Sequence, residues 1–173
     1  MVDWLDSDIN PQIPDGAEDD TYQNLQPAYR AANRLMVDIT ELRLIKGIDG
    51  KAYRALSPHV AALPQRTTLN VNTAGVLVLR SLASQISESD AESLIDGRGK
   101  EGYKTVAEFL AQDALAGLVD GELKNEGLGV TSSYYLLLGE AQISDARLIM
   151  NAVLKRDGEF SSILHRAYGT YEQ

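Results

Sequence analysis

The chain opens with residues 1–22, MVDWLDSDINPQIPDGAEDDTY, and this segment decides how the first part of the protein folds. It carries seven carboxylates, and no Lys or Arg precedes Arg30. At contact distance, each pair of like charges repels by about 1 kcal/mol even in bulk water. The segment must therefore stay extended in solvent or share a multivalent cation. The acids are Asp3, Asp6, Asp8, Asp15, Glu18, Asp19 and Asp20.

The residues between these acids favour the second outcome. A tail that only needs to stay solvated has no use for large apolar side chains, whereas an ordered loop needs both apolar anchors and turn formers. The apolar residues are Trp4, Ile9, Ile13 and Tyr22, and the turn formers are Pro11, Pro14 and Gly16. The composition predicts an ordered, metal-bound loop, and a solvated acidic linker is the alternative.

Every candidate metal donor in this segment is an oxygen atom. Carboxylates, Asn10 and turn carbonyls are available, the chain contains no Cys, and its histidines, His59 and His165, lie far downstream. Oxygen-only sites favour calcium.

The nearest template for such a site is the EF-hand loop. Asp6, Asp8 and Asn10 match its first three ligands. Pro11 then stands where the loop requires Gly, and Ala17 stands where it requires the bidentate Glu. The segment therefore predicts a calcium site of a different geometry.

The remainder of the chain is nearly neutral. The formal net charge is −9, and the seven acids of the opening segment leave −2 for everything after it. Such a body offers no electrostatic field to nucleic acid phosphates. With 173 residues and 44% hydrophobic residues, the chain can bury a core as one domain or two small lobes. No apolar run approaches the roughly 20 residues that a membrane-spanning helix needs.

The pattern after the acidic segment is helical and then briefly strand-like. Apolar residues recur at helical spacing from Thr40, a plausible N-cap, to Pro58, with a break at residues 46–50. This pattern predicts a helical hairpin. Residues 67–73, TTLNVNT, alternate apolar and polar side chains as in a short half-buried strand.

The second half predicts another helical block followed by a β-meander. The helical repeats cover residues 76–82, 90–95 and 106–110. Alternating apolar positions then predict strands at residues 134–143, 148–154 and 160–168, with Asp157 and Gly158 as a turn between the last two.

Catalytic motifs are weak in this sequence. His59 follows a proline at a helix end and His165 lies in an apolar strand, so both are expected to be surface or packing residues. Residues 97–99, GRG, lack the third glycine of a dinucleotide-binding loop. The clustered carboxylates are better explained by shared metal ligation than by glycoside hydrolysis, and a metal-dependent hydrolase would need an open cleft. We therefore expect no enzyme activity.

Residues 42–52, LRLIKGIDGKA, are similar to a helix-hairpin-helix, which makes a nucleic-acid-binding module the alternative function. In that motif a Gly-x-Gly turn presents backbone N–H groups to a phosphate. Here Asp49 replaces the second glycine, and its carboxylate would repel the phosphate. Residues 83–87, in the corresponding place of the second block, contain no glycine, although residues 102–110 resemble the element that follows such hairpins.

Several sequence blocks together resemble the minor pseudopilin K family of the bacterial type II secretion system. The resemblance extends over essentially the whole chain, and its acidic and Asn-rich blocks are more specific than its helices. The blocks are residues 2–8 (VDWLDSD), 15–22 (DGAEDDTY), 27–33 (PAYRAAN), 41–43 (ELR) and 69–74 (LNVNTA).

The resemblance implies an α+β fold, in which a partial pilin-like antiparallel sheet carries a large inserted α-helical domain with helix-hairpin-helix-like elements. It implies that a leader, an apolar helix and the first strands lie upstream of Met1, so that alternating Tyr134, Leu136 and Leu138 are partly bare. The expected division is an acidic calcium-binding loop region at 1–34, a helical domain at 35–66 and 74–128, and the pseudopilin β-sheet at 67–73 and 129–173.

The resemblance also implies a structural role at the tip of the periplasmic pseudopilus, which supports secretion of folded exoproteins across the outer membrane. The implied partners are minor pseudopilins I and J, then the major pseudopilin and secreted exoproteins, and no nucleic acid. The protein is expected in the periplasm, anchored to the inner membrane only through the upstream helix. One or two Ca²⁺ ions are expected on Asp6, Asp8, Asp15, Glu18 and Asp19, with Asp3, Asn10, Asp20 and Asn33 as outer candidates.

Overall fold

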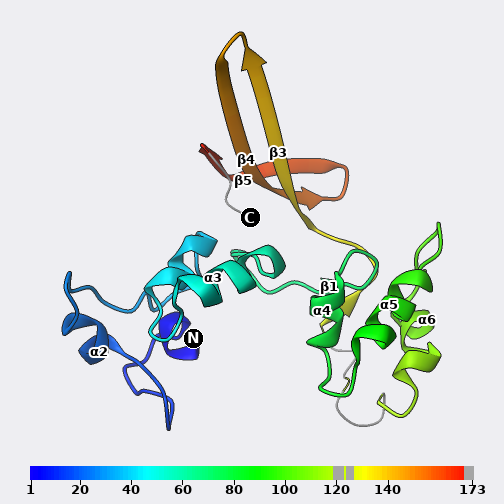
Figure 1. Cartoon of the computed structure of the whole chain (residues 1–173), viewed down its shortest axis with the longest axis horizontal. Coiled ribbons are helices and arrows are strands. Elements are labelled where there is room, and N and C mark those ends of the chain that lie inside the picture. Colours follow the sequence, from blue (N-terminus) through cyan, green and yellow to red (C-terminus); the bar gives the residue numbers. More distant parts are fainter. Residues whose placement is uncertain (119–122, 124–126, 170–173) are drawn as a thin grey trace. The chain divides into compact units, whose positions relative to one another are not determined.

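The chain folds into two compact units. The computed structural model describes residues 1–118, 123 and 127–169 (Figure 1). The first unit is Met1–Arg66 and the second is Thr67–Glu172. Helices occur in both units, and the second also contains an antiparallel sheet, so the predicted mixture of helices with such a sheet is confirmed. None of the helices in the described ranges combines the length and apolar character needed to cross a bilayer.

The first unit consists of short helical segments joined by loops. Each spans only one or two turns, which is too short to be stable alone in water. Its buried hydrophobic residues, which hold these segments together, are Trp4, Ala17, Tyr22, Leu42, Ile45 and Tyr53. The segments are α1 (Val2–Leu5), α2 (Asp19–Gln23), the 3₁₀ helix η1 (Ile39–Leu44), α3 (Gly50–Leu56) and the 3₁₀ helix η2 (Ser57–His59).

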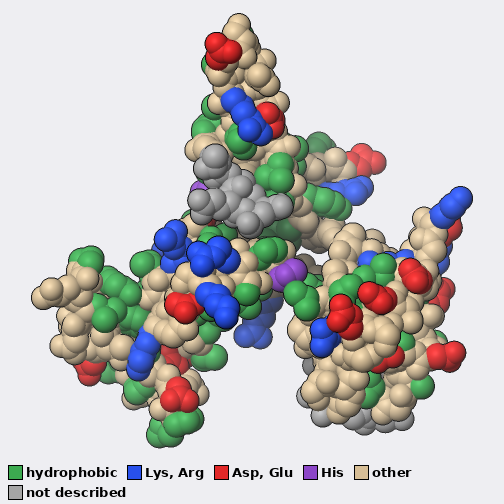
Figure 2. Space-filling view, in the orientation of Figure 1, with side chains coloured by type: hydrophobic (Ala, Val, Ile, Leu, Met, Phe, Trp, Pro, Cys, Tyr) green, Lys and Arg blue, Asp and Glu red, His purple; other side chains and the backbone are tan. Residues whose placement is uncertain are grey.

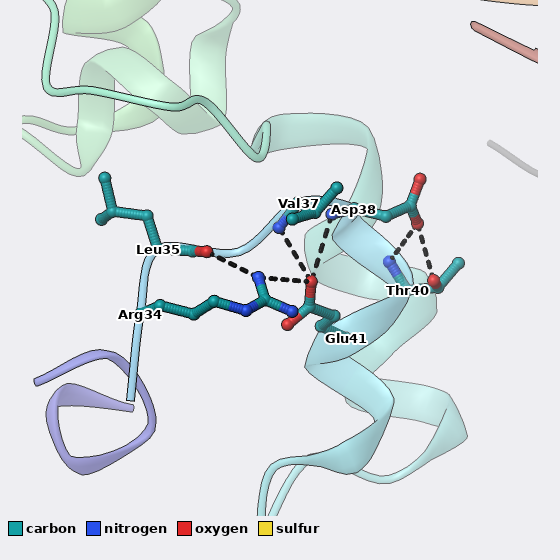
Figure 3. A network of polar contacts seen from close by, with 6 residues as sticks. All are labelled: Arg34, Leu35, Val37, Asp38, Thr40 and Glu41. Atoms are coloured by element: carbon teal, nitrogen blue, oxygen red, sulfur yellow. Dashed lines mark hydrogen bonds and ion pairs between the residues drawn. The ribbon is translucent and has the colours of Figure 1, made fainter. Parts of the chain in front are cut away.

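The N-cap of η1 is Asp38, and the prediction that Thr40 caps this helix is wrong. The Asp38 carboxylate accepts hydrogen bonds from the Thr40 backbone N–H at 2.8 Å and from the Thr40 hydroxyl at 2.6 Å (Figure 3). Glu41 in return accepts from the Asp38 backbone N–H at 3.4 Å, which completes a capping box. Both Asp and Thr can cap a helix, and the position of Glu41 three residues later selects Asp38.

Glu41 also holds the chain that enters η1. Its carboxylate accepts from the Val37 backbone N–H at 2.8 Å and lies 3.6 Å from the Arg34 guanidinium. Arg34 also donates to the Leu35 carbonyl at 3.0 Å. The side chains of Arg34 and Glu41 therefore hold the chain between them in place (Figure 3).

The second unit begins with a helical lobe around its own core. The predicted helical repeats are confirmed as α4 (Val76–Arg80), α5 (Glu88–Asp96) and α6 (Val106–Leu110), followed by the 3₁₀ helix η3 (Asp113–Leu115). Ser87 caps α5 and Thr105 caps α6 through their side chains. The core includes the fully buried Val71, Leu79, Ala91, Leu94, Phe109 and Leu115.

A short parallel pair of strands belongs to this lobe. β1 (Leu69–Asn70) pairs with β2 (Leu128–Gly129), so β1 lies in a two-stranded sheet and not in the larger sheet with which the family resemblance grouped it. It is also shorter than the predicted 67–73, because the chain turns after Asn70: the Thr73 and Ala74 N–H groups both donate to the Asn70 carbonyl.

Asn72 ties this turn to two distant segments. Its side-chain oxygen accepts from the Tyr103 N–H at 2.8 Å, and its amide nitrogen donates to the carbonyls of Tyr103 at 3.0 Å and Val130 at 3.1 Å. Only a side chain with both an acceptor and a donor can satisfy all three groups.

The predicted β-meander is confirmed as a three-stranded antiparallel sheet. Its order is β3 (Tyr134–Ile143), β4 (Ala146–Asp157) and β5 (Phe160–Tyr168). β4 is longer than the predicted 148–154, and Gly158 has the positive φ of 61° that the turn after Asp157 requires. The helix-hairpin-helix details of the predicted fold are not established by this architecture.

The three-stranded sheet exposes apolar side chains on both faces. Consecutive residues of a strand point to opposite faces. Four consecutive side chains of β3, Tyr135, Leu136, Leu137 and Leu138, are each 43–50% exposed. Leu136 and Leu138 are exposed, which confirms the expectation for these positions, whereas Tyr134 is half-buried. The opposite face, which carries Tyr135 and Leu137, is exposed as well. Hydrophobic side chains are visible on the surface of this sheet in Figure 2.

The Asn72 contacts predict that Asn72→Asp strongly destabilises the second unit. A carboxylate there would face the Tyr103 and Val130 carbonyl oxygens, and the loss of donors to partly buried acceptors costs about 3 kcal/mol. Urea unfolding should show a lower midpoint with an unchanged slope. Gln65→Glu makes the same amide-to-acid change at an exposed position and should leave the midpoint unchanged. Equal midpoints for both variants would contradict this role.

Candidate metal centre

Aromatic packing fixes the backbone that carries the acidic residues. The Trp4 ring packs edge to face on Tyr22, with 5.2 Å between ring centroids, and also contacts Tyr29 at 6.3 Å. Tyr22 and Tyr29 stack at 5.4 Å. These rings connect α1, where Asp3 is located, to α2, which starts at Asp19. Of the apolar residues in the opening segment, Ile9 and Ile13 are exposed, so Trp4 and Tyr22 provide its anchors.

Three carboxylates of the opening segment converge. One oxygen atom from each of Asp6, Asp8 and Glu18 lies within 4.8 Å of the other two. Asp6 is the C-cap of α1, Asp8 lies two residues further along, and Glu18 is the N-cap of α2. The fold thus brings together acids that are up to twelve positions apart in the sequence.

Glu18 is the member of this group that most requires a partner. It is only 5% exposed, and neither of its carboxylate oxygens has a hydrogen-bond partner in the described part of the chain. One oxygen of Asp6 is in the same situation. A buried, unpaired carboxylate is costly unless it binds a cation or a proton.

The same surroundings raise the pKa of two of these carboxylates. The pKa of Glu18 is raised, first by burial and then by the negative charges of Asp6, Asp3, Asp8 and Asp19. The pKa of Asp6 is raised by desolvation, followed by repulsion from Asp8 and Asp3. The group therefore favours the binding of a proton or a cation. Its possible metal ligands are all oxygen atoms, which calcium prefers.

The other two predicted ligands lie outside this three-carboxylate group. Asp19 has an ion-pair partner in Arg30, at 3.7 Å, and accepts a hydrogen bond from the Ala31 N–H at 3.0 Å. Asp15 is exposed at the turn of the loop. The sequence offered no way to rank these acids, because the partner of Asp19 lies eleven residues downstream and is brought close only by the fold.

The outer candidates fall into different environments. Asn33 has one buried side-chain oxygen without a hydrogen-bond partner among the described residues, and its backbone N–H donates to the Trp4 carbonyl at 3.0 Å. Asn10 and Asp20 are exposed. Asp3 is buried, and its carboxylate accepts hydrogen bonds from backbone N–H groups of the loop.

The segment considered for nucleic acid binding has no free phosphate cradle at Asp49. The Asp49 carboxylate itself accepts from the backbone N–H groups of Lys51 at 2.9 Å and Ala52 at 2.8 Å. These are N–H groups at the start of α3 that a phosphate would need. The alternative function therefore gains no support. His59 is exposed and His165 half-buried, in keeping with surface and packing positions.

Comparisons with known proteins agree on one family. Two family models, both described as type II secretion system (T2SS), protein K, match residues 1–65 and 69–131. Type II secretion system protein K of Pseudomonas aeruginosa is 40% identical over 90% of this chain and 45% of its own length. Its counterpart from Klebsiella pneumoniae is 32% identical over 99% of this chain and 53% of its own length.

A solved structure shows the same fold. One chain in the crystal structure of the GspK-GspI-GspJ complex from the enterotoxigenic Escherichia coli type 2 secretion system matches with a TM-score of 0.82 and 30% identity. The match covers 98% of this chain and 61% of that chain. The present chain spans about half the length of the curated relatives named above.

The raised pKa of Glu18 predicts a pH-dependent effect of Glu18→Gln in metal-free protein. The folded state binds the Glu18 proton more tightly than the unfolded state does, so rising pH removes stability once it passes the ordinary glutamate pKa. At neutral pH in excess chelator, the variant should therefore melt at a higher temperature than the unaltered protein. The difference in melting temperature should shrink as the pH falls toward 4. An equal difference at neutral pH and at pH 4 would contradict a buried, charged Glu18.

Proposed function

The chain belongs to the type II secretion system protein K family, and on this premise we propose that it is a structural minor pseudopilin located at the tip of the pseudopilus. In this role it assembles with pseudopilins I and J and supports secretion of folded exoproteins across the outer membrane. The proposal places the protein in the periplasm, anchored to the inner membrane through a segment of the longer protein. The major pseudopilin and the exoproteins are its further contacts.

The observation that carries this proposal is the likeness of nearly the whole chain to a subunit solved as part of a GspK-GspI-GspJ complex. The exposed sheet supports it independently. Runs of large apolar side chains exposed on both faces of a sheet mark surfaces that are covered in an assembly. The sequence also contains no catalytic constellation around its two histidines, which fits a structural and not an enzymatic role.

We further propose that Asp6, Asp8 and Glu18 bind calcium. Their oxygens converge within 4.8 Å, and Glu18 contributes a buried carboxylate whose charge has no partner among the described residues. Bound calcium would neutralise the repulsion within this group and connect α1 to α2. The ion therefore has a structural function in the proposal.

Removal of calcium should lower the melting temperature. A ligand present at 100 times its Kd stabilises the folded state by about 2.7 kcal/mol. We expect thermal unfolding to shift to lower temperature in excess EGTA and to recover when calcium is restored. Emission from Trp4, the single tryptophan, should report the loosening of the acidic segment because this ring packs on Tyr22.

Two variants separate a specific site from general charge effects. Glu18→Gln should lose most of the calcium-dependent shift, whereas Asp15→Asn removes one charge from the same segment at an exposed position and should keep it. Identical melting curves of the unaltered protein with calcium and with EGTA would eliminate the calcium proposal.

The assembly role predicts association with pseudopilins I and J. A form of the protein extended to the length of its relatives should co-elute with homologues of I and J in size-exclusion chromatography. Two double variants test the two faces of β3 separately. Leu136→Ser with Leu138→Ser alters one face, and Tyr135→Ser with Leu137→Ser alters the other. Loss of a central apolar contact should weaken binding about tenfold or more.

The matched control for these variants is Leu77→Ser, which changes an exposed leucine on α4 outside the sheet. We expect at least one of the two sheet variants to weaken association and the control to leave it unchanged. Separate elution of all three proteins at micromolar concentration would argue against the assembly role.

A further inference from the structure

Asp3 differs from the other acids of the opening segment because its carboxylate is satisfied by the protein backbone. It is 3% exposed and projects from α1. One oxygen accepts from the Ala17 N–H at 2.6 Å, and the two oxygens accept from the Gln12 N–H at 3.2 and 3.3 Å. A carboxylate that accepts hydrogen bonds from two backbone N–H groups is stabilised in a buried position without a cation.

These bonds close the loop that separates Asp6 from Glu18. Within the loop, the Gly16 N–H donates to the Gln12 carbonyl at 2.6 Å, so the chain folds back on itself. The Asp3 carboxylate then accepts hydrogen bonds from both ends of this turn, from the N–H groups of Gln12 and Ala17. Ala17 directly precedes Glu18, and the contact therefore sets where the Glu18 backbone enters the three-carboxylate group.

Gly16 shows how tightly this closure is built. A Cβ at this position would lie 2.4 Å from the Asp3 carboxylate and 2.3 Å from the Gln12 backbone nitrogen. Both distances are far shorter than any normal contact, so a side chain at position 16 would displace the Asp3 carboxylate and the Gln12 backbone that it binds. The glycine is required here for space.

We propose that Asp3 is a positioning residue for the calcium site and not one of its ligands. It holds the loop between Asp6 and Glu18 in the calcium-binding arrangement before the ion arrives. This inference rests on the proposed calcium site. Mutation of a residue that orients metal ligands typically lowers metal affinity 10–100-fold.

Tb³⁺, which replaces calcium in oxygen sites, provides the test in the whole chain. Trp4 lies beside Asp3 and can sensitise Tb³⁺ luminescence, so titration gives the affinity, and lifetimes in H₂O and D₂O give the number of water molecules on the ion. We expect Asp3→Asn to weaken Tb³⁺ and calcium binding at least tenfold with the same number of bound waters as in the unaltered protein. A ligand that is lost would instead be replaced by water.

Two further variants separate position from charge. Asp15→Asn removes the same unit of charge at an exposed site in this loop and should change affinity much less than Asp3→Asn. Gly16→Ala changes no charge and no oxygen donor, yet it should weaken binding in the same way because it displaces Asp3. Gly16→Ala also decides the question if Asp3→Asn does not fold.

Each other result overturns the proposal in a recognisable way. Additional water on Tb³⁺ in Asp3→Asn would make Asp3 a ligand. Unchanged affinity in Asp3→Asn or in Gly16→Ala would show that the closure does not position the site. If the unaltered protein binds neither Tb³⁺ nor calcium, the proposed calcium site fails together with this inference, and that result differs from the others because Asp15→Asn would not bind either.

Discussion

The first unit depends on the balance between aromatic packing and carboxylate repulsion. Trp4 packs on Tyr22, and this contact brings the start of α2 against α1. The same packing gathers Asp6, Asp8 and the buried Glu18 within 4.8 Å of one another. Hydrophobic burial therefore concentrates negative charge here, and neither oxygen of the Glu18 carboxylate has a hydrogen-bond partner among the described residues. Protons or the proposed calcium ion can relieve this repulsion.

The helices of both units depend on contacts beyond their own hydrogen bonds. Among the described helices, α5 is the longest with nine residues, which is below the length at which an isolated helix is stable. Side-chain caps compensate at the N-termini, as with Asp38 at η1, Asp49 at α3 and Ser87 at α5. Buried residues of each core supply the remainder. Hydrogen bonds such as those of Asn72 to Tyr103 and Val130 add contacts between segments that are distant in the sequence.

Local patterns predicted the longer elements of the second unit, whereas α1, α2, η3 and β2 were not predicted, and only the fold determined which elements are partners. Helical and alternating periodicities located α4, α5, α6 and the three-stranded sheet, because the spacing of apolar residues within such a segment is a local property of the sequence. The pairing of β1 with β2 was missed because these two-residue strands are almost sixty positions apart. The ligand chemistry of the acidic segment followed from composition, but the partners of Asp19 and of Asp3 did not. Arg30 and the loop N–H groups become their neighbours only after folding.

The geometry of the proposed site suits a structural ion better than a catalytic one. A catalytic metal needs a cleft and a free coordination position. Here the carboxylates of Asp6 and Glu18 come from the two ends of one loop, and Asp3 already holds that loop closed. An ion shared by these two residues would act as a cross-link over about a dozen residues. In a disulfide-bonded protein, a cross-link over 15 residues contributes about 3 kcal/mol by restricting the unfolded chain. The proposed ion would give the acidic segment a restriction of the same kind without a disulfide, since this chain contains no cysteine.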